Sequence, residues 1–71
     1  MKITANDYKA NEIIKIIREW TGKTQTEFGR AIHRSKSAIQ FYEYGQRNYD
    51  VELLLQIAKA ENLIITIEKK N

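Results

Sequence analysis

Apolar residues recur three to four positions apart along most of the chain, in four segments separated by short polar stretches. This spacing is typical of amphipathic helices that bury one face. We predict helices over residues 7–21, 25–32, 36–44 and 51–61. The chain is therefore expected to be an all-α domain of four helices, followed by a segment of different character.

Residues suited to helix ends flank these four segments. Side chains that accept hydrogen bonds from a first helical turn precede them: Asp7, Thr24, Ser35 and Asp50. Residues that readily adopt a left-handed backbone follow three of them: Gly22, Gly45 and Asn62. Thr24 and Glu27 also have the spacing of a capping box, in which each side chain accepts a hydrogen bond from the backbone N–H of the other.

Each expected helix has an apolar face, which we expect to form the core. The expected core residues are Ala10, Ile14, Ile17, Phe28, Ala31, Ile32, Ala38, Ile39, Tyr42, Val51, Leu54, Leu55, Ile57 and Ala58. The first helix carries a second apolar stripe, made by Ile13, Ile16 and Trp20. A first helix in a small bundle needs only one buried face, so the second stripe requires a partner.

Residues 63–68 are rich in β-branched side chains and alternate in polarity, which is typical of a strand. Leu63, Ile65 and Ile67 fall on one side of this expected strand. An unpaired apolar strand is prone to aggregate, so we expect it to be paired, and two partners are open. One is the same segment of a second subunit, and the other is a short N-terminal strand at residues 2–4. In either arrangement the strand would pack against the second stripe of the first helix.

Positive charge is concentrated in one part of the chain. The formal net charge is +3, and the whole excess lies between Lys23 and Asn48, because the charges elsewhere balance. A local basic field attracts phosphate groups. A solvated face with a chance imbalance is the alternative interpretation of the charge alone.

The composition excludes several kinds of site. The chain has no Cys and one His, so disulfides and thiolate metal sites are excluded, and we expect neither a metal nor a cofactor. No apolar run is longer than that of residues 63–65, which is far too short to cross a bilayer. The beginning of the chain lacks the apolar segment typical of a signal peptide. A cytoplasmic location without membrane association is therefore expected.

Residues 24–45 have the layout of a helix-turn-helix, in which two short helices are joined by a tight turn. The first helix of such a unit braces across the DNA backbone and the second lies in the major groove. Small or apolar residues suit the crossing of the two helices: Ala31, Ile32, Ala38 and Ile39. Polar residues suit the outer face of the second helix: Lys36, Ser37 and Gln40.

This region resembles the phage-repressor/Cro-like (XRE) family of helix-turn-helix proteins. The resemblance rests on T-Q-T-E-F-G at 24–29, a Ser-capped helix ending in Y-E-Y-G at 42–45, R-N-Y at 47–49 and L-L-Q-I-A-K-A at 54–60. Together with the first helix it covers about residues 9–62. It implies a four-helix, lambda-repressor-like DNA-binding domain, to which this chain adds the expected C-terminal strand.

The resemblance also implies roles for single residues. Four residues match the base-reading positions of the family or lie on the same face of the recognition helix: Lys36, Ser37, Gln40 and Phe41. Five residues are expected to contact phosphates, either from the resemblance or from their residue type: Gln25, Arg34, Arg47, Asn48 and Tyr49. Arg18 and Glu43 match a structural pair that joins the first helix to the recognition helix.

Several of these residues have a structural alternative. Gln25 can brace the recognition helix, Lys36 can be an ordinary solvated lysine, and Phe41 can be a core residue or an anchor for a protein partner. His33 stands where the family has Gly, so a positive φ is expected there, and as the only His it leaves a catalytic or pH-sensing role open. Gly29, in place of Ala, permits a very close helix crossing.

The leading hypothesis is a sequence-specific transcriptional repressor that binds double-stranded DNA at a palindromic operator as a homodimer. The alternative is the antitoxin of a toxin–antitoxin pair, which binds its own operator and a toxin protein. A protein-interaction module that has lost DNA binding is disfavoured, because the charge of residues 23–48 is basic. An enzyme is least favoured, because the sequence suggests no Ser–His–acid arrangement and no phosphate-cradling glycine loop.

Overall fold

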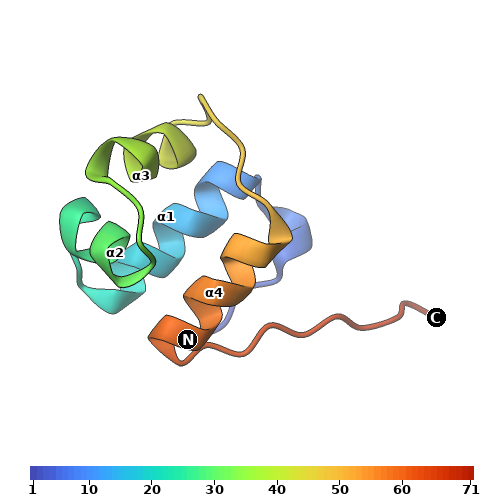
Figure 1. The fold of residues 1–71 in the computed structure, drawn as a ribbon. Coiled ribbons are helices and arrows are strands. Elements are labelled where there is room, and N and C mark those ends of the chain that lie inside the picture. The colour runs from blue at the N-terminus through green and yellow to red at the C-terminus, as the bar shows by residue number, and fades with distance from the viewer.

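Capping side chains set where three of the four helices begin. The structure, a computed structural model, describes residues 1–71; after a 3-10 turn (η1, Ala5–Asp7) it contains α1 (Ala10–Thr21), α2 (Gln25–Ala31), α3 (Lys36–Glu43) and α4 (Val51–Glu61) (Figure 1). Thr24, Ser35 and Asp50 each accept a hydrogen bond from the third backbone N–H of the helix that follows, at distances between 2.8 and 3.2 Å. Glu27 accepts from the Thr24 N–H at 2.9 Å, which completes the predicted capping box. None of the helices has the length and apolar composition needed to cross a membrane.

The first helix begins later than predicted, and the assignment of Asp7 as its N-cap is wrong. Asp7 is the last residue of η1, and the residues that follow it, Tyr8 and Lys9, are extended. The N-cap of α1 is Lys9, whose N–H donates to the Glu12 carboxylate at 2.8 Å. Asp7 is therefore separated from the first turn of α1 by extended backbone and cannot cap it.

The turn between α2 and α3 is tight and has the predicted left-handed residue. His33 has a φ of 58°. The Arg34 N–H donates to the Gly29 carbonyl at 2.8 Å, which folds the turn back onto α2. A Cβ at residue 29 would lie 2.4 Å from the Arg34 carbonyl oxygen, so this approach requires Gly. The left-handed helix ends predicted elsewhere are also confirmed, with φ of 70°, 74° and 57° at Gly22, Gly45 and Asn62.

The core is assembled from all four helices. Each helix contributes one fully buried side chain: Ile14, Phe28, Ile39 and Ile57. Burying a side chain of this size stabilises the fold by about 1.5–3 kcal/mol. Around these four lie Ile32, which caps the end of α2, and further buried residues of the helices: Ile17, Ala38, Tyr42 and Leu53.

Four residues expected in the core are exposed instead: Ala10, Ala31, Val51 and Leu55. Val51 and Leu55 lie one turn apart on the same side of α4, whereas Leu53 and Ile57 carry the buried side. The apolar stripe of α4 is wider than the surface that the other helices cover, so one edge of the stripe faces solvent.

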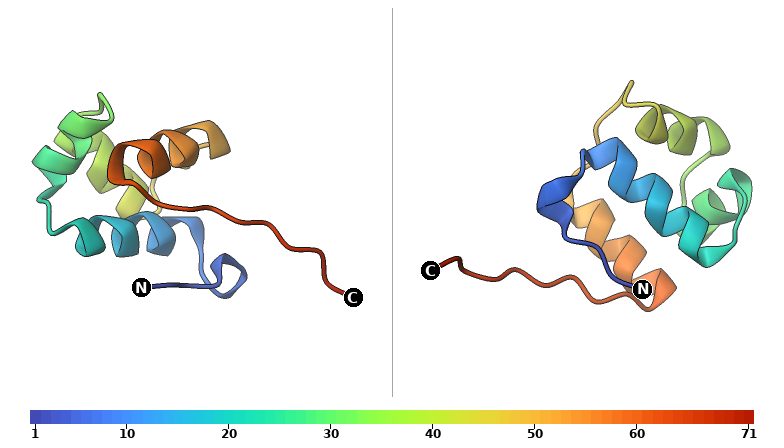
Figure 2. Two further views of the ribbon diagram at one scale, coloured as in Figure 1. Left: turned by 90° about the horizontal axis from the view of Figure 1, so that it is seen from below. Right: turned by 180° about the vertical axis from the view of Figure 1, so that it is seen from behind.

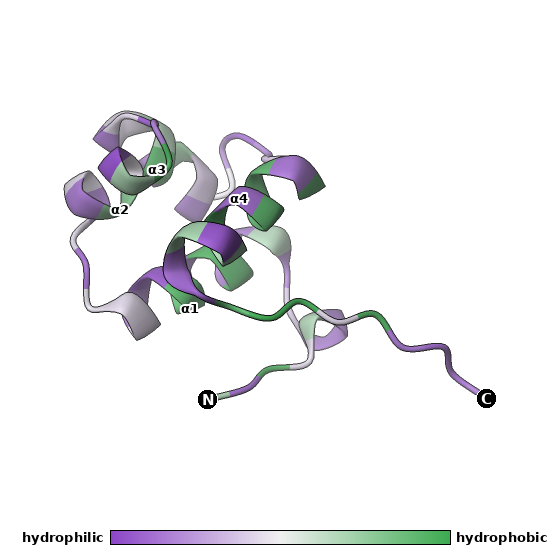
Figure 3. Cartoon of the chain, turned by 60° about the horizontal axis from the view of Figure 1, so that its bottom comes forward, coloured by the Kyte–Doolittle hydropathy of each residue, from purple (hydrophilic) through white to green (hydrophobic).

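No strand forms in the segment after α4. Leu63 donates its N–H to the Ala58 carbonyl at 2.8 Å and packs on the core, but residues 64–71 form no backbone hydrogen bond. The predicted C-terminal strand and its pairing with residues 2–4 are therefore absent from the single chain, because extended backbone becomes a strand only where a neighbour supplies partners. Figure 3 shows the apolar residues of this tail projecting from the helices. Both termini lie at the end of the molecule away from α3 (Figures 1 and 2).

Candidate nucleic-acid interface

The recognition helix α3 has a buried side and a solvent side. The buried side consists of Ala38, Ile39, Tyr42 and Glu43. The solvent side carries the residues predicted to read bases: Lys36, Ser37, Gln40 and Phe41. Lys36 and Ser37, in the first turn, are exposed, whereas Gln40 is partly covered. The helix therefore presents a mostly polar surface whose N-terminal half is the most accessible part.

Glu43, on the buried side, is held by the predicted partner on α1. Arg18 approaches its carboxylate with two nitrogens, Nε at 2.6 Å from Oε2 and Nη2 at 3.1 Å from Oε1. The Glu43 side chain is only 2% exposed. The hydrogen bond to Glu43 is the main cause that raises the pKa of Arg18, with burial acting against it. This forked geometry orients α3 relative to α1 more strictly than a single contact does.

Gln25 contacts the same carboxylate from the start of α2. Its Nε2 donates to Glu43 Oε1 at 3.3 Å, which is the bracing role that the sequence left open. Asn11 of α1 donates to the Glu43 carbonyl at 3.4 Å. Arg18 also donates to the Lys23 carbonyl at 3.1 Å, in the loop between α1 and α2. The orientation of the recognition helix is thus set by polar contacts with both preceding helices and with the loop between them.

The loop after α3 folds back onto the last turn of the helix. The N–H of Gly45 donates to the Tyr42 carbonyl at 3.3 Å, and the N–H of Gln46 donates to the Phe41 carbonyl at 2.9 Å. This pair of hydrogen bonds, with Gly45 left-handed, is a Schellman motif. The Arg47 N–H reaches the same Phe41 carbonyl at 3.2 Å. The loop therefore delivers its exposed residues, Arg47 and Asn48, to the end of the recognition helix.

The remaining phosphate candidate, Arg34, lies at the other end of α3. Its side chain is exposed and its Nη1 is 3.4 and 3.5 Å from the carbonyl oxygens of His33 and Ile32. These weak contacts hold the guanidinium close to the turn, without an acidic partner. Cations consequently stand before and after the recognition helix.

A comparison with protein-family models identifies the family that has this arrangement of helices. A model described as "Helix-turn-helix" matches residues 14–62, which include α2, α3, α4 and the loops between them. The chain belongs to the phage-repressor/Cro-like (XRE) helix-turn-helix family. This is a family of sequence-specific DNA-binding transcriptional regulators. No curated protein and no solved structure matches the chain.

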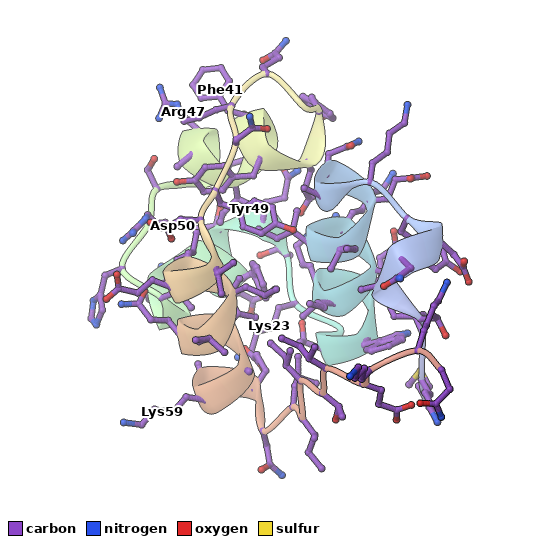
Figure 4. The ribbon with its side chains drawn as sticks, turned by 90° about the vertical axis from the view of Figure 1, so that its right-hand side faces the viewer. Lys23, Phe41, Arg47, Tyr49, Asp50 and Lys59 are labelled. Atoms are coloured by element: carbon purple, nitrogen blue, oxygen red, sulfur yellow. The ribbon has the colours of Figure 1, made fainter.

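Tyr49, for which the sequence predicts a phosphate contact, makes two contacts inside this helix-turn-helix protein. Its hydroxyl donates to the Ala10 carbonyl at 2.6 Å, and its ring meets the Tyr42 ring edge-on at a centroid distance of 5.7 Å. Figure 4 shows the side chain directed from the loop toward α1. The hydroxyl hydrogen is donated inside the protein, so Tyr49 joins the loop to α1.

Sequence reasoning missed one contact that ties the helix-turn-helix to α4. Lys23 Nζ lies 2.6 Å from Glu61 Oε1, and the Glu61 side chain is mostly buried. The two residues are 38 positions apart, and neither stands in a local motif. Only the packing of α4 beside the loop between α1 and α2 brings them together.

The structure gathers no group of three or more His, Cys, Asp or Glu side chains that could hold a metal ion. The single His, His33, is exposed in the turn before α3. In the structure, His33 supplies the left-handed backbone conformation that the turn requires.

We expect Tyr49→Phe to lower the free energy of unfolding by about 1 kcal/mol at neutral pH, because it removes one hydrogen bond. Burial raises the pKa of Tyr49 above its ordinary value. In the unfolded chain Tyr49 ionises near pH 10, whereas in the folded protein it keeps its proton to a higher pH. From about pH 10 upward, ionisation therefore stabilises the unfolded wild type and lowers its free energy of unfolding as the pH rises through the folded pKa. The stability gap between wild type and variant should therefore shrink above about pH 10.

This pH dependence is measured by urea unfolding of both proteins between neutral and strongly alkaline pH. Tyr44→Phe, at an exposed tyrosine, is the matched control and should follow the wild type closely. A gap between wild type and Tyr49→Phe that is the same at every pH would contradict the burial of this hydroxyl.

Proposed function

We propose that this protein is a transcriptional repressor that recognises a double-stranded DNA operator with α3. The observation that carries the proposal is the exposed polar face of α3 with a cation at each end, Arg34 before the helix and Arg47 after it. A helix presented in this way fits the major groove of B-DNA, while cations at its ends meet the phosphates on either side. Occupying an operator then blocks transcription.

The proposal divides the interface into base contacts and phosphate contacts. Lys36, Ser37 and Gln40 supply the base contacts, because the N-terminal part of a recognition helix approaches the base edges. A lysine suits guanine O6 and N7, and a glutamine suits adenine. Phosphate contacts are assigned to the exposed or partly exposed residues around α3: Gln25, Arg34, Arg47 and Asn48. The net charge of residues 23–48 supports this division, since phosphate contacts supply much of the affinity.

We further propose that two copies bind a palindromic operator and pair through the tail, residues 63–67. The tail is extended, and Ile65 and Ile67, on the side proposed to pair, are 42% and 95% exposed. The second stripe of α1, which is partly exposed in the single chain, is the surface that such a pair would cover: Ile13, Ile16 and Trp20. Because the tail leaves the molecule away from α3, a tail-mediated dimer keeps both recognition helices free (Figure 1). A palindromic operator requires the two helices of such a dimer to lie one DNA turn apart, about 34 Å.

Side chains alternate between the two sides of the tail, and this alternation favours one antiparallel register between the tails of the two copies. Pairing Ile65 with its own counterpart places Leu63 opposite Ile67 of the second copy, so every apolar residue of that side stays on one face. The same register brings Lys69 near the C-terminal end of α4 of the second copy. A lysine there is favoured by the helix dipole.

A second candidate function is that of an antitoxin, and the exposed apolar tail is the observation that favours it. An apolar segment of this kind also suits a protein partner. The DNA-binding surface is the same for both candidates. An antitoxin differs in forming a stoichiometric complex with the product of a neighbouring gene, and that complex binds the operator.

The base and phosphate assignments are tested by selecting DNA from a random pool and measuring gel shifts at several salt concentrations. The wild type should enrich a palindrome, and its affinity should fall steeply with salt. Lys36→Ala should relax the preference at one base pair of each half-site, by about 1–3 kcal/mol of discrimination. Arg47→Ala should weaken binding to all sequences about equally and reduce the salt slope by about 1. If both variants lose affinity uniformly, Lys36 does not read a base.

The tail proposal is tested by sedimentation of single variants of the full chain. Ile65→Lys places a charge at the centre of the proposed ribbon and should give a monomer. Ile64→Lys is the matched control, because this residue lies on the opposite side of the tail, and it should remain dimeric. A chain ending at Asn62 should also be monomeric. A dimer that survives both Ile65→Lys and the truncation would overturn the pairing.

A further inference from the structure

Arg47 and Phe41 form a stacked pair at the end of the recognition helix. The guanidinium carbon of Arg47 lies 5.0 Å from the centroid of the Phe41 ring, within the range of a cation–π contact. Figure 4 shows the two side chains projecting from the same edge of the molecule. From the sequence alone, the two residues are expected to make separate contacts, Phe41 to a base and Arg47 to a phosphate.

The backbone holds the same two residues together. The Phe41 carbonyl accepts the N–H of Gln46 at 2.9 Å and the N–H of Arg47 at 3.2 Å. Phe41 thus fixes Arg47 twice, through its carbonyl and through its ring. A long, flexible side chain is confined near α3 before any ligand binds, which lowers the conformational entropy lost on binding.

The stacked guanidinium keeps its hydrogen-bonding capacity. The Arg47 side chain makes no hydrogen bond and no ion pair in the structure, in contrast to Arg18, whose donors are bound to Glu43 and Lys23. A cation–π contact uses the charge of the guanidinium and none of its N–H donors. An Arg held in this way keeps its fork of donors for a phosphate, which it can bind with two hydrogen bonds.

We infer that Phe41 is a positioning residue, which holds Arg47 ready for a DNA phosphate and does not read a base itself. The inference rests on the proposed function, since the phosphate belongs to the operator. Phe41 stays 37% exposed, and the Arg47 guanidinium lies over its ring, so on that face the cation takes the place that a thymine methyl group would occupy. The aromatic residue supports affinity for all sequences and leaves the choice of base to the first turn of α3.

The test is a double-mutant cycle on operator affinity, with Phe41→Leu and Arg47→Ala alone and together. Phe41→Leu should weaken binding about two- to fivefold in the wild-type background, as expected for an exposed cation–π contact. In the Arg47→Ala background it should cost nothing further. Phe41→Tyr keeps the ring and should bind like the wild type. The order of preferred bases at every operator position should be the same for all four proteins of the cycle, which are the wild type, the two single variants and the double variant.

A second readout uses the free protein and needs no DNA. Side-chain protons of Arg47 should be shifted upfield by the Phe41 ring current in the NMR spectrum of the wild type and of Phe41→Tyr, and this shift should vanish in Phe41→Leu. Tyr8→Leu is the control for loss of a surface aromatic, because Tyr8 is 40% exposed and lies outside the interface. It should change neither the Arg47 signals nor the affinity.

The possible failures are distinguishable. An equal loss from Phe41→Leu in both backgrounds, with relaxed preference at one base pair, would assign base reading to Phe41 and overturn the inference. Unshifted Arg47 signals in the free wild type, or an unchanged affinity of Phe41→Leu, would also overturn it while the proposed function stands. A wild type that enriches no DNA sequence would overturn both.

Discussion

The position of the recognition helix depends on one buried carboxylate. Glu43 is the last residue of α3, and a buried carboxylate without a partner costs several kcal/mol. Arg18 of α1 neutralises it with two nitrogens, and Gln25 of α2 donates to the same group. Because Arg18 also holds the Lys23 carbonyl, the loop between α1 and α2 belongs to the same network. A shift of α3 relative to either helix would leave a charged group or a donor without its partner.

The two ends of α3 are fixed in a complementary way. Before the helix, the left-handed backbone of His33 and the close approach at Gly29 set the angle at which α3 leaves α2. After it, the Schellman motif folds residues 45–47 back onto the last turn, and Tyr49 fastens the following residues to α1. One face of α3 is thereby directed to solvent, with the Arg47 guanidinium beside it. The fold thus prepares the exposed side of a helix and the cations around it before DNA arrives.

The features that depend on neighbours in the sequence were predictable. The cap at Thr24 follows from side-chain type and spacing, and the positive φ of His33 followed from its place where the resembling family has Gly. Arg18–Glu43 followed from the family resemblance, because periodicity does not relate residues 25 positions apart. The features that the sequence did not show have tertiary causes. Nothing local shows that the Tyr49 hydroxyl reaches the Ala10 carbonyl of α1. The strand predicted over residues 63–68 does not form in the single chain because no edge is present for it to pair with, and its pairing across a dimer stays a prediction.

The central claim is that DNA is bound by the outer face of α3 and the loop that follows it. A titration of the isotopically labelled chain with its selected operator duplex, monitored through backbone amide NMR signals, tests this most directly. The account predicts that the largest shifts fall on residues 34–41 and 46–48 and on the start of α2, while η1 and α4 change little. If the largest shifts instead fall on α4 or on the N-terminal segment, the helix-turn-helix is not the surface that binds DNA.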